Sequence, residues 1–468
     1  MKIKLHWLFI TLALIACTPS LRAQIPVFQV TTNAAGVALA TSGTNCLSLM
    51  LSGTNVCFQL FSTNGTVIGT TNTIGSSQSF PLVAYGGGEY LVYWDDTFID
   101  SGGVYGQIIS AGGHVMGSPF AIGMPGTPSG GLGAPRALAS DGTNFLAVFQ
   151  YNGNDIYGQV ITAAGTTNSA FLISSQLQNG SSAAAIYGKT NYLVIWQSNN
   201  NDTGNTNQAY GEFVTSIGSA GSPFQISQTA SIDQNPEAVA FDGTNYLAVW
   251  PWNPGPETDQ SVTNWDLYGR LVSQTGSLPG SELHLVTDPG SQYFPSLTFD
   301  GANYLLAWGN NPGGAALSSS TNYITLQFFN LSGSAIGPEF NLFPAQGTNV
   351  PAFVAIQSVG NTIAAVGTLG SPIFTDSNLN GFASASVFGA FIPVSTASPT
   401  LTASNLTGTQ FPLQLTGTPG INYAIQISTN LATSSWTPVF TNSPTNGTFS
   451  FTDPNATNKY RFYRSVKQ

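Results

Sequence analysis

A polar turn followed by an uninterrupted apolar run recurs along the chain. The segment "DGTNYLAVW" begins at Asp242, "DGANYLLAW" begins at Asp300, and five other copies resemble them. Measured at the first apolar position, the copies are 44 to 58 residues apart, and these positions are Cys46, Tyr90, Phe145, Tyr192, Tyr246, Tyr304 and Thr362. A period near 50 residues indicates a repeat architecture, either a solenoid or a propeller.

Each repeat contains four segments with the pattern of β-strands. The apolar run is followed by a segment such as "VYGQIIS" from Val104, then by a Gly-containing turn and a short segment such as "PFAIG", and another short segment precedes the polar turn. Nothing in the repeats has helical periodicity. Seven repeats of four strands predict an all-β fold, a seven-bladed β-propeller of four-stranded blades. Because a blade is packed on both faces, its strands are continuously apolar.

The two ends of the repeat region complement each other. The last repeat lacks a fourth strand before the composition changes near Ser395, whereas "IPVFQV", from Ile25 to Val30, has the fourth-strand pattern and no partners of its own. We therefore predict that the N-terminal strand pairs into the last blade and closes a propeller spanning residues 24–394, which removes an open sheet edge. Residues 395–468 hold about six short strands between Gly, Pro and Asn turns, a pattern that predicts a small β-sandwich.

The first residues have the features of a secretory signal peptide. Two lysines precede the apolar stretch Leu8–Ala16, and Pro19 and Ala23 follow it, so we predict cleavage after Ala23 and a signal peptide over residues 1–23. The alternative is that "LIAC", ending at Cys17, is a lipoprotein box that anchors the protein through a lipid. No other apolar run approaches about 18 residues, so no transmembrane segment is expected. The predicted location is secreted or extracytoplasmic, in a periplasm or at a cell surface.

Two cysteines, Cys46 and Cys57, remain in the predicted mature chain. They lie near opposite ends of neighbouring predicted strands, on the order of 13 Å apart at about 3.3 Å per residue. A disulfide needs Cα atoms closer than about 7 Å. We therefore predict two packed thiols.

Charge is scarce in this sequence. Only 6% of the residues are charged, against about 25% in an ordinary soluble domain, and the formal net charge is −10. A negative net charge makes nucleic acid a poor partner. The 42% of hydrophobic residues can bury a substantial core, which argues against disorder.

Two parts of the chain resemble known families. The paired elements "DGTNYLAVW" and "DIYGQV" resemble repeats of largely uncharacterised secreted bacterial β-propeller proteins, and "GINYAIQISTNL" with the later "RFYR" resembles a fibronectin-III-like C-terminal domain of secreted bacterial proteins. Together the two resemblances cover nearly all of the predicted mature chain. They imply a fold and an extracytoplasmic address, and no chemistry.

The repeated residues are predicted to be structural. In a short turn, Asp bonds a backbone N–H while Gly adopts positive φ, which accounts for the turn acids Asp141, Asp242 and Asp300. The tryptophans that end the apolar runs share a strand face with the preceding Tyr, so we predict that they pack between blades. They are Trp94, Trp196, Trp250 and Trp308.

The variable loops between second and third strands are more informative about recognition. In the fifth repeat, Trp252 and Trp265 bracket Glu257 and Asp259, and Asp266 follows. Aromatic rings beside carboxylates suit carbohydrate, because the rings stack on sugar faces and the carboxylates accept hydroxyl hydrogen bonds. The alternative is a loop that folds over its own tryptophans.

Two further candidate sites lie elsewhere. Arg136 and Glu237 follow prolines at the start of inner strands and are predicted to reach the channel mouth, where a structural ion pair or simple solvation is the alternative. The segment "DSNLNG" offers Asp376, Asn378 and Asn380 as the first half of a calcium loop. It has a single carboxylate and Val387 at the position where the loop needs Glu, so calcium is a weak candidate and no other cofactor is expected.

Catalysis has little support in the sequence, which lacks a His cluster with metal-ligand spacing. A glycosidase needs two placed carboxylates. The acids predicted near the variable loops include Asp95, Asp96, Asp100, Asp202, Glu237 and Asp259. We therefore predict a secreted, non-catalytic binding protein that recognises carbohydrate or a cell-surface protein. The alternatives are a polysaccharide hydrolase or lyase using these carboxylates, and a structural envelope or matrix protein.

Overall fold

The computed structural model describes residues 25–77, 81–96, 103–123, 132–151, 155–175, 183–198, 207–228, 237–253, 265–311, 323–343, 350–370, 385–393, 400–403, 411–416, 423–429, 436–442, 448–454 and 461–467. Every regular element in these ranges is a β-strand. None of the described residues belongs to a helix with the length and apolarity that crossing a membrane requires. The predicted signal peptide and Cys17 lie outside the described residues.

Seven four-stranded antiparallel sheets follow one another within these ranges, and we number them in chain order. The first three sheets are β2 (Ala35–Thr41), β3 (Asn45–Ser52), β4 (Asn55–Ser62) and β5 (Val67–Ser76); β6 (Leu82–Gly86), β7 (Glu89–Asp96), β8 (Gly103–Ser110) and β9 (Val115–Ile122); and β10 (Leu132–Ser140), β11 (Asn144–Tyr151), β12 (Asp155–Thr162) and β13 (Phe171–Ser174). The fourth and fifth are β14 (Ala183–Tyr187), β15 (Asn191–Ser198), β16 (Gln208–Thr215) and β17 (Phe224–Gln225); and β18 (Ala238–Phe241), β19 (Asn245–Trp252), β20 (Asp266–Ser273) and β21 (Leu283–Val286). The sixth is β22 (Ser291–Phe299), β23 (Tyr304–Asn311), β24 (Tyr323–Phe329) and β25 (Ala335–Leu342), and the seventh is β26 (Val350–Val359), β27 (Thr362–Gly370) and β28 (Ser386–Pro393) with β1 (Val27–Thr32).

The N-terminal strand completes the seventh sheet, as the sequence predicts. β1 runs antiparallel to β28, with Val27 opposite Ala390. The Phe28 ring lies 5.9 Å from Phe391 in the same sheet and 5.4 Å from Phe61 in the first sheet. The first residues of the described chain therefore join its last four-stranded sheet to its first one.

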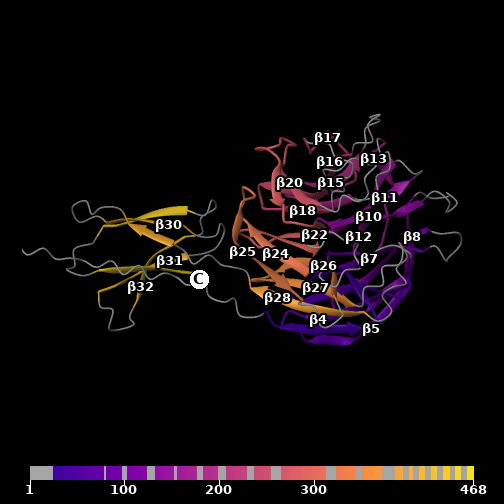
Figure 1. Ribbon diagram of the computed structural model, residues 1–468, viewed down its shortest axis with the longest axis horizontal. Coiled ribbons are helices and arrows are strands. Elements are labelled where there is room, and N and C mark those ends of the chain that lie inside the picture. The colour runs from indigo at the N-terminus through magenta and orange to yellow at the C-terminus, as the bar shows by residue number, and fades with distance from the viewer. Residues whose placement is uncertain are drawn as a thin grey trace, which may run out of the picture.

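The seven sheets form a propeller-like arrangement. Their first strands contact one another in the cyclic order β2, β6, β10, β14, β18, β22 and β26, and β26 contacts β2. Figure 1 shows β18, β22 and β26 near a common centre and β5, β17 and β25 at the periphery. The all-β, propeller-like fold predicted from the repeats is thus observed.

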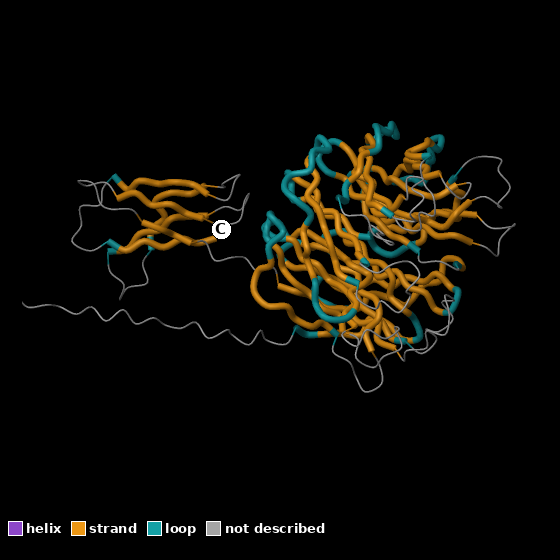
Figure 2. Tube along the Cα trace, turned by 45° about the horizontal axis from the view of Figure 1, so that its top comes forward, coloured by secondary structure: helices purple, strands orange, loops and turns teal. Residues whose placement is uncertain are grey.

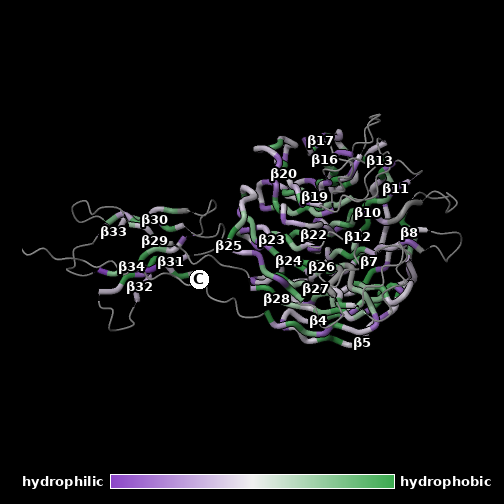
Figure 3. Tube along the Cα trace, viewed as in Figure 1, coloured by the Kyte–Doolittle hydropathy of each residue, from purple (hydrophilic) through white to green (hydrophobic). Residues whose placement is uncertain are grey.

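Apolar clusters fill the spaces between neighbouring sheets. Each of seven clusters in the described residues combines side chains from two adjacent sheets, including one between the seventh sheet and the first. Trp196, for example, packs with Val148 and Val160 of the third sheet. The four tryptophans that end the apolar runs are at most 2% exposed, which confirms the prediction that they pack between sheets. Figure 3 shows the hydrophobic stretches at β7 and β31 (Tyr423–Ser428) in green.

The polar turns are held by their own acids and by the next sheet. Asp141 Oδ1 accepts hydrogen bonds from the backbone N–H groups of Thr143 (2.8 Å) and Asn144 (2.7 Å), and Gly142 has φ of 90°, which favours glycine. Asp242 and Asp300 form the same bonds. The turn acids are therefore structural, as predicted.

A tyrosine hydroxyl crosses to the turn of the preceding sheet at several interfaces. Tyr90 donates to the carbonyl of Asn45 (2.8 Å), and Tyr304 donates to Asp242 Oδ2 (2.9 Å). Strand pairing places Ile363 at this position in the seventh repeat, so the alignment of Thr362 with these tyrosines was wrong by one residue. The repeat there lacks the Tyr that four of the other repeats carry at this position.

The two cysteines are buried free thiols, which confirms the prediction. Cys46 lies opposite Phe61 and Cys57 lies opposite Met50, so they are four pairs apart along β3 and β4.

Two three-stranded sheets follow in the last part of the chain. Their strands are β29 (Thr400–Ala403), β30 (Phe411–Thr416) and β33 (Thr448–Asp453), and β32 (Thr437–Asn442), β31 and β34 (Phe462–Lys467). Side chains from both sheets, among them Leu413, Tyr423 and Phe449, form one apolar cluster. Figures 1 and 2 show these strands apart from the seven four-stranded sheets.

Candidate functional site

The two ends of each four-stranded sheet differ in kind. Consecutive antiparallel strands reverse direction, so the connections alternate between the two ends of the sheet. We call the end with the first-to-second and third-to-fourth turns the turn face. We call the other end the loop face, which carries the second-to-third loops and the connections to the next sheet. Five of the seven predicted site residues lie at the loop face by this topology, and they are Arg136, Glu237, Trp252, Trp265 and Asp266.

A cavity of about 220 Å³ opens among the inner strands on the loop-face side. Its lining comes from β6, β10, β14, β18 and β22, and it includes both Arg136 and Glu237. The structure therefore brings these two predicted residues to the same cavity. The other lining residues are Ala, Leu, Val and Pro together with Ser296, and polar atoms make up most of the exposed lining.

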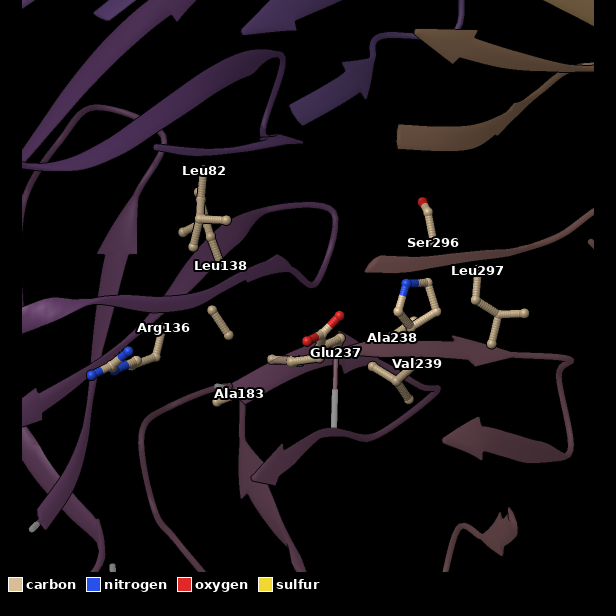
Figure 4. Close-up of a pocket in the computed structure, with 13 residues that line it drawn as sticks. Leu82, Arg136, Leu138, Ala183, Glu237, Ala238, Val239, Ser296 and Leu297 are labelled. Atoms are coloured by element: carbon tan, nitrogen blue, oxygen red, sulfur yellow. The ribbon is translucent and has the colours of Figure 1, made fainter. Parts of the chain in front are cut away.

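Arg136 supports the wall of this cavity. Figure 4 shows its guanidinium directed away from the other labelled side chains, and Nη2 donates a hydrogen bond to Gln150 Oε1 on β11. Burial lowers the pKa of Arg136, and the nearby Tyr93 and Asp95 of the second sheet counteract that effect. Arg136 thus bonds to β11 of its own sheet and lies near Tyr93 and Asp95 of the second sheet.

Glu237 has a different orientation. In Figure 4 its carboxylate lies among the labelled side chains, between those on the Arg136 side and Ser296. The Ser296 hydroxyl accepts a hydrogen bond from the Ile356 N–H (3.1 Å). The cavity can therefore offer a carboxylate acceptor, which suits a hydroxyl or amine group. Its volume is below the range of about 300–1,000 Å³ for drug-sized ligands, so it suits one end group.

The Trp252 side chain packs against other side chains of the fifth sheet. Its ring stacks on Tyr268 at 4.7 Å, and Tyr268 lies 4.4 Å from the ring of His284. The three rings form a row across β19, β20 and β21. Trp252 also packs against the cluster between the fourth and fifth sheets. This agrees with the alternative in which the loop tryptophans pack against their own repeat.

Trp265 and Asp266 lie beside this row at the start of β20. Asp266 is opposite Trp252, is 9% exposed, and has a pKa raised by burial, which His284 counteracts and Asp288 reinforces. The Trp265 carbonyl accepts a hydrogen bond from the Gln292 N–H (2.8 Å), and its side chain is half-buried. The structure thus places the half-buried Trp265 and the buried Asp266 at the loop-face end of β20. Glu257 and Asp259 lie outside the described residues.

The remaining predicted acids add little. Asp95 accepts a hydrogen bond from the Ser77 hydroxyl. The Asp96 side chain and Asp100, Asp202, Asp376, Asn378 and Asn380 lie outside what the structure describes. Within the described ranges there is no group of three or more His, Cys, Asp or Glu residues that could hold a metal ion.

One set of polar residues escaped the sequence analysis. In six of the seven sheets the middle of the third strand carries a buried polar side chain, and the seventh sheet has Ala390 there. The six polar residues are Gln59, Gln107, Gln159, Glu212, Arg270 and Gln327. Comparing the third strands column by column would have revealed it. The apolar second strands dominated the alignment instead.

Comparison with known proteins gives fold-level likeness alone. No family model and no curated protein matches the chain. Among solved structures, puromycin hydrolase is 11% identical with a TM-score of 0.45, over 82% of this chain and 58% of that one. The RRP9 WD40 repeats are 12% identical with a TM-score of 0.43, over 80% and 98%. The GH43 endo-arabinanase from Bacillus licheniformis is 14% identical with a TM-score of 0.33, over 55% and 92%. TM-scores this low carry no argument about function.

Proposed function

We propose that residues 24–394 are a seven-bladed β-propeller closed by β1 and that residues 395–468 are a fibronectin-III-like β-sandwich. The cyclic contacts of the first strands and the pairing of β1 with β28 support the closed ring. Deleting residues 24–30 tests it, because a ring that loses its closing strand exposes a sheet edge and unfolds at a lower temperature. An unchanged thermal midpoint would contradict the closure.

We further propose that this is a secreted or extracytoplasmic, non-catalytic protein that binds carbohydrate or a cell-surface protein through its loop face. The observation that carries the proposal is the division of polar groups between the two faces. Turn-face acids and tyrosines hydrogen-bond to the turns themselves, whereas the loop face carries the cavity with Glu237 and the indole of Trp265 beside Asp266. An indole and a carboxyl group can together contact the ring and hydroxyls of a sugar.

Binding to a broad glycan and polysaccharide array tests this function. The purified chain from Gln24 onward is applied with calcium and with chelator, beside Trp265→Ala. Trp265 is the better target than Trp252, since Trp252 stacks on Tyr268 and its loss would disturb the sheet. Trp436→Ala is the matched control, because Trp436 is half-buried like Trp265 and lies against Arg464 in the last part of the chain.

The expected result is a glycan signal that Trp265→Ala abolishes and Trp436→Ala keeps. A signal that both variants keep would exclude the fifth-sheet end as the binding site. No glycan signal for the wild type would refute the carbohydrate proposal and favour a protein partner or an envelope role. A signal that appears with calcium and not with chelator would indicate a metal-dependent site and would favour the calcium candidate around Asp376.

A polysaccharide hydrolase is the second candidate, and Asp266 is the observation in its favour. Its raised pKa, with Asp288 nearby, is what a general acid needs, and a glycosidase would pair it with a second carboxylate about 5 to 9.5 Å away. Release of reducing ends from each bound polysaccharide tests this. Release that Asp266→Asn abolishes would replace the binding proposal with a catalytic one.

A further inference from the structure

Glutamine side chains on the third strands donate hydrogen bonds where the pairing with the fourth strand changes register. In the first sheet the pairing of β4 with β5 shifts between Phe58 and Leu60, and Gln59 Nε2 donates to the carbonyls of Leu60 (3.1 Å) and Ile68 (2.7 Å). The second and sixth sheets repeat this with Gln107 and Gln327. A side-chain amide thus supplies the donors that a regular strand ladder would provide.

The third sheet shows which backbone carbonyl the side chain in the middle of the third strand contacts. Gln159 Nε2 donates to the Asn168 carbonyl (2.6 Å), and the Asn168 N–H donates to Val160 (3.0 Å). In the fourth sheet the Gly221 N–H donates to the carbonyl of Phe213 (3.0 Å), which directly follows Glu212 as Val160 follows Gln159. Gly221 therefore corresponds to Asn168, and its carbonyl faces the side chain of residue 212.

The fourth sheet has Glu212 at this position, and it is 1% exposed. Its strand neighbours Tyr210 and Val214 belong to the cluster shared with the third sheet, so alternation along β16 directs Glu212 to the same side. Its Oε2 has no hydrogen-bond partner among the described residues. An ionised carboxylate only accepts hydrogen bonds, so it cannot do what the glutamine amide does, whereas a protonated carboxyl group donates one.

We propose that Glu212 is held as a neutral carboxylic acid that donates its proton to the Gly221 carbonyl, and that loss of this proton releases the outer strand of the fourth sheet. That strand, β17, has only two residues. Nearby, Ile217 in the turn between β16 and β17 is 82% exposed. The other contacts of this segment are few and include the Ile226 and Ser227 N–H bonds to the Ala209 carbonyl and the stacking of Phe224 on Phe213. Loss of the proton therefore removes one of a small number of contacts.

The surroundings of Glu212 favour the neutral form. Burial raises its pKa from 4.5 to about 7. The titratable groups on the same side of its own sheet are Tyr187, Tyr192 and Tyr210. The third sheet presents Val160, Ile173 and Phe171 here, and the acid on its third strand, Asp155, lies at the loop-face end of β12. No cation among these groups stabilises the carboxylate.

The sign of the pH effect follows from this shift. In the unfolded chain Glu212 ionises near its ordinary pKa, whereas in the folded chain it keeps its proton up to about pH 7. Stability is therefore fullest below about pH 4.5 and is lost as the pH rises to about 7. Between pH 5 and pH 8 the folding equilibrium constant falls by up to about 50-fold through this group alone.

Glu212→Gln is the test, because it installs the amide found in four other sheets. Thermal midpoints of the wild type and the variant are compared at pH 5 and pH 8. We expect the variant to be more stable than the wild type at pH 8 and to lose less stability between the two pH values. Other acids with raised pKa, such as Glu339, titrate equally in both proteins, so the difference isolates Glu212.

Gln159→Glu is the matched converse in the third sheet. It should add a new loss of stability between pH 5 and pH 8. Backbone hydrogen exchange provides a second measurement, since the Ile226 N–H, which donates to Ala209 (2.7 Å), should lose protection above pH 7 in the wild type and keep it in Glu212→Gln. Equal pH dependence in wild type and Glu212→Gln, or unchanged protection of Ile226, would overturn the proposal.

Discussion

The turn face and the loop face are built from the same strands but use their polar residues differently. On the turn face Asp242 accepts two backbone N–H groups and the hydroxyl of Tyr304 from the next sheet. On the loop face Glu237 lies in an open cavity and Asp266 stands at the start of a strand beside Trp265. The repeated residues therefore maintain the sheets. The binding site that we propose uses residues that do not repeat.

The largest expected effect comes from removing Asp242. Asp242→Ala loses two charge-assisted turn bonds and the partner of Tyr304, so we expect a loss of about 3 kcal/mol in the free energy of unfolding. Asp141→Ala is the comparison, because Asp141 Oδ1 forms the same two turn bonds, while Tyr192 of the next sheet lies near Asp141 but has its hydroxyl 3.4 Å from the Asn144 carbonyl. Urea unfolding should show a smaller loss for Asp141→Ala. Equal losses would mean that the tyrosine contact contributes nothing.

Tyr304→Phe isolates that contact. It removes a hydrogen bond of 2.9 Å to a carboxylate and leaves the ring in place, for an expected loss of about 2 kcal/mol. The same urea titration measures it. Combining it with Asp242→Ala should give less than the sum of the two losses, since both remove the same bond. Additive losses would show that the hydroxyl and the carboxylate act independently.

Much of this architecture could be predicted from the sequence, because it depends on local and periodic features. The four-strand pattern, the pairing of β1 with β28 and the structural role of Asp141 each follow from residue type and spacing. The tyrosine contacts could not be predicted, because they join residues more than forty positions apart and depend on how two sheets meet. The misalignment at Thr362 arose because Ile363 lacks the Tyr hydroxyl that four of the other repeats carry at this position.

The candidate site was less predictable than the fold. Proximity of Arg136 and Glu237 followed from their equal positions in the repeats, but the guanidinium direction depends on Gln150 and on the second sheet. The stacking of Trp252 on Tyr268 also required the structure, because it crosses two strands. Glu212 was overlooked for a different reason. A single acid within "YGEFV" looks ordinary until the glutamines of the other sheets are seen to donate hydrogen bonds.

A weaker turn-face contact should have a smaller effect. Tyr246 donates to the neutral carbonyl of Asn191 at 3.3 Å, longer than the usual O–H···O distance of about 2.7–2.8 Å. Tyr246→Phe should therefore cost below about 1 kcal/mol. Its loss is compared with that of Tyr304→Phe under identical conditions. A loss for Tyr246→Phe as large as that for Tyr304→Phe would show that the charge of Asp242 is not what distinguishes the two interfaces.

The smallest change in stability is expected on the loop face, and there the comparison between the faces is sharpest. Glu237→Gln keeps the shape of the side chain and one acceptor oxygen and removes its charge, so it should change the free energy of unfolding by less than about 1 kcal/mol. If the cavity receives an end group that donates hydrogen bonds to the carboxylate, affinity for the glycan that binds the wild type best should fall about tenfold. Unchanged affinity together with a clear effect of Trp265→Ala would confine recognition to the fifth sheet. A marked loss of stability in Glu237→Gln would instead make this carboxylate part of the framework, like the acids of the turn face.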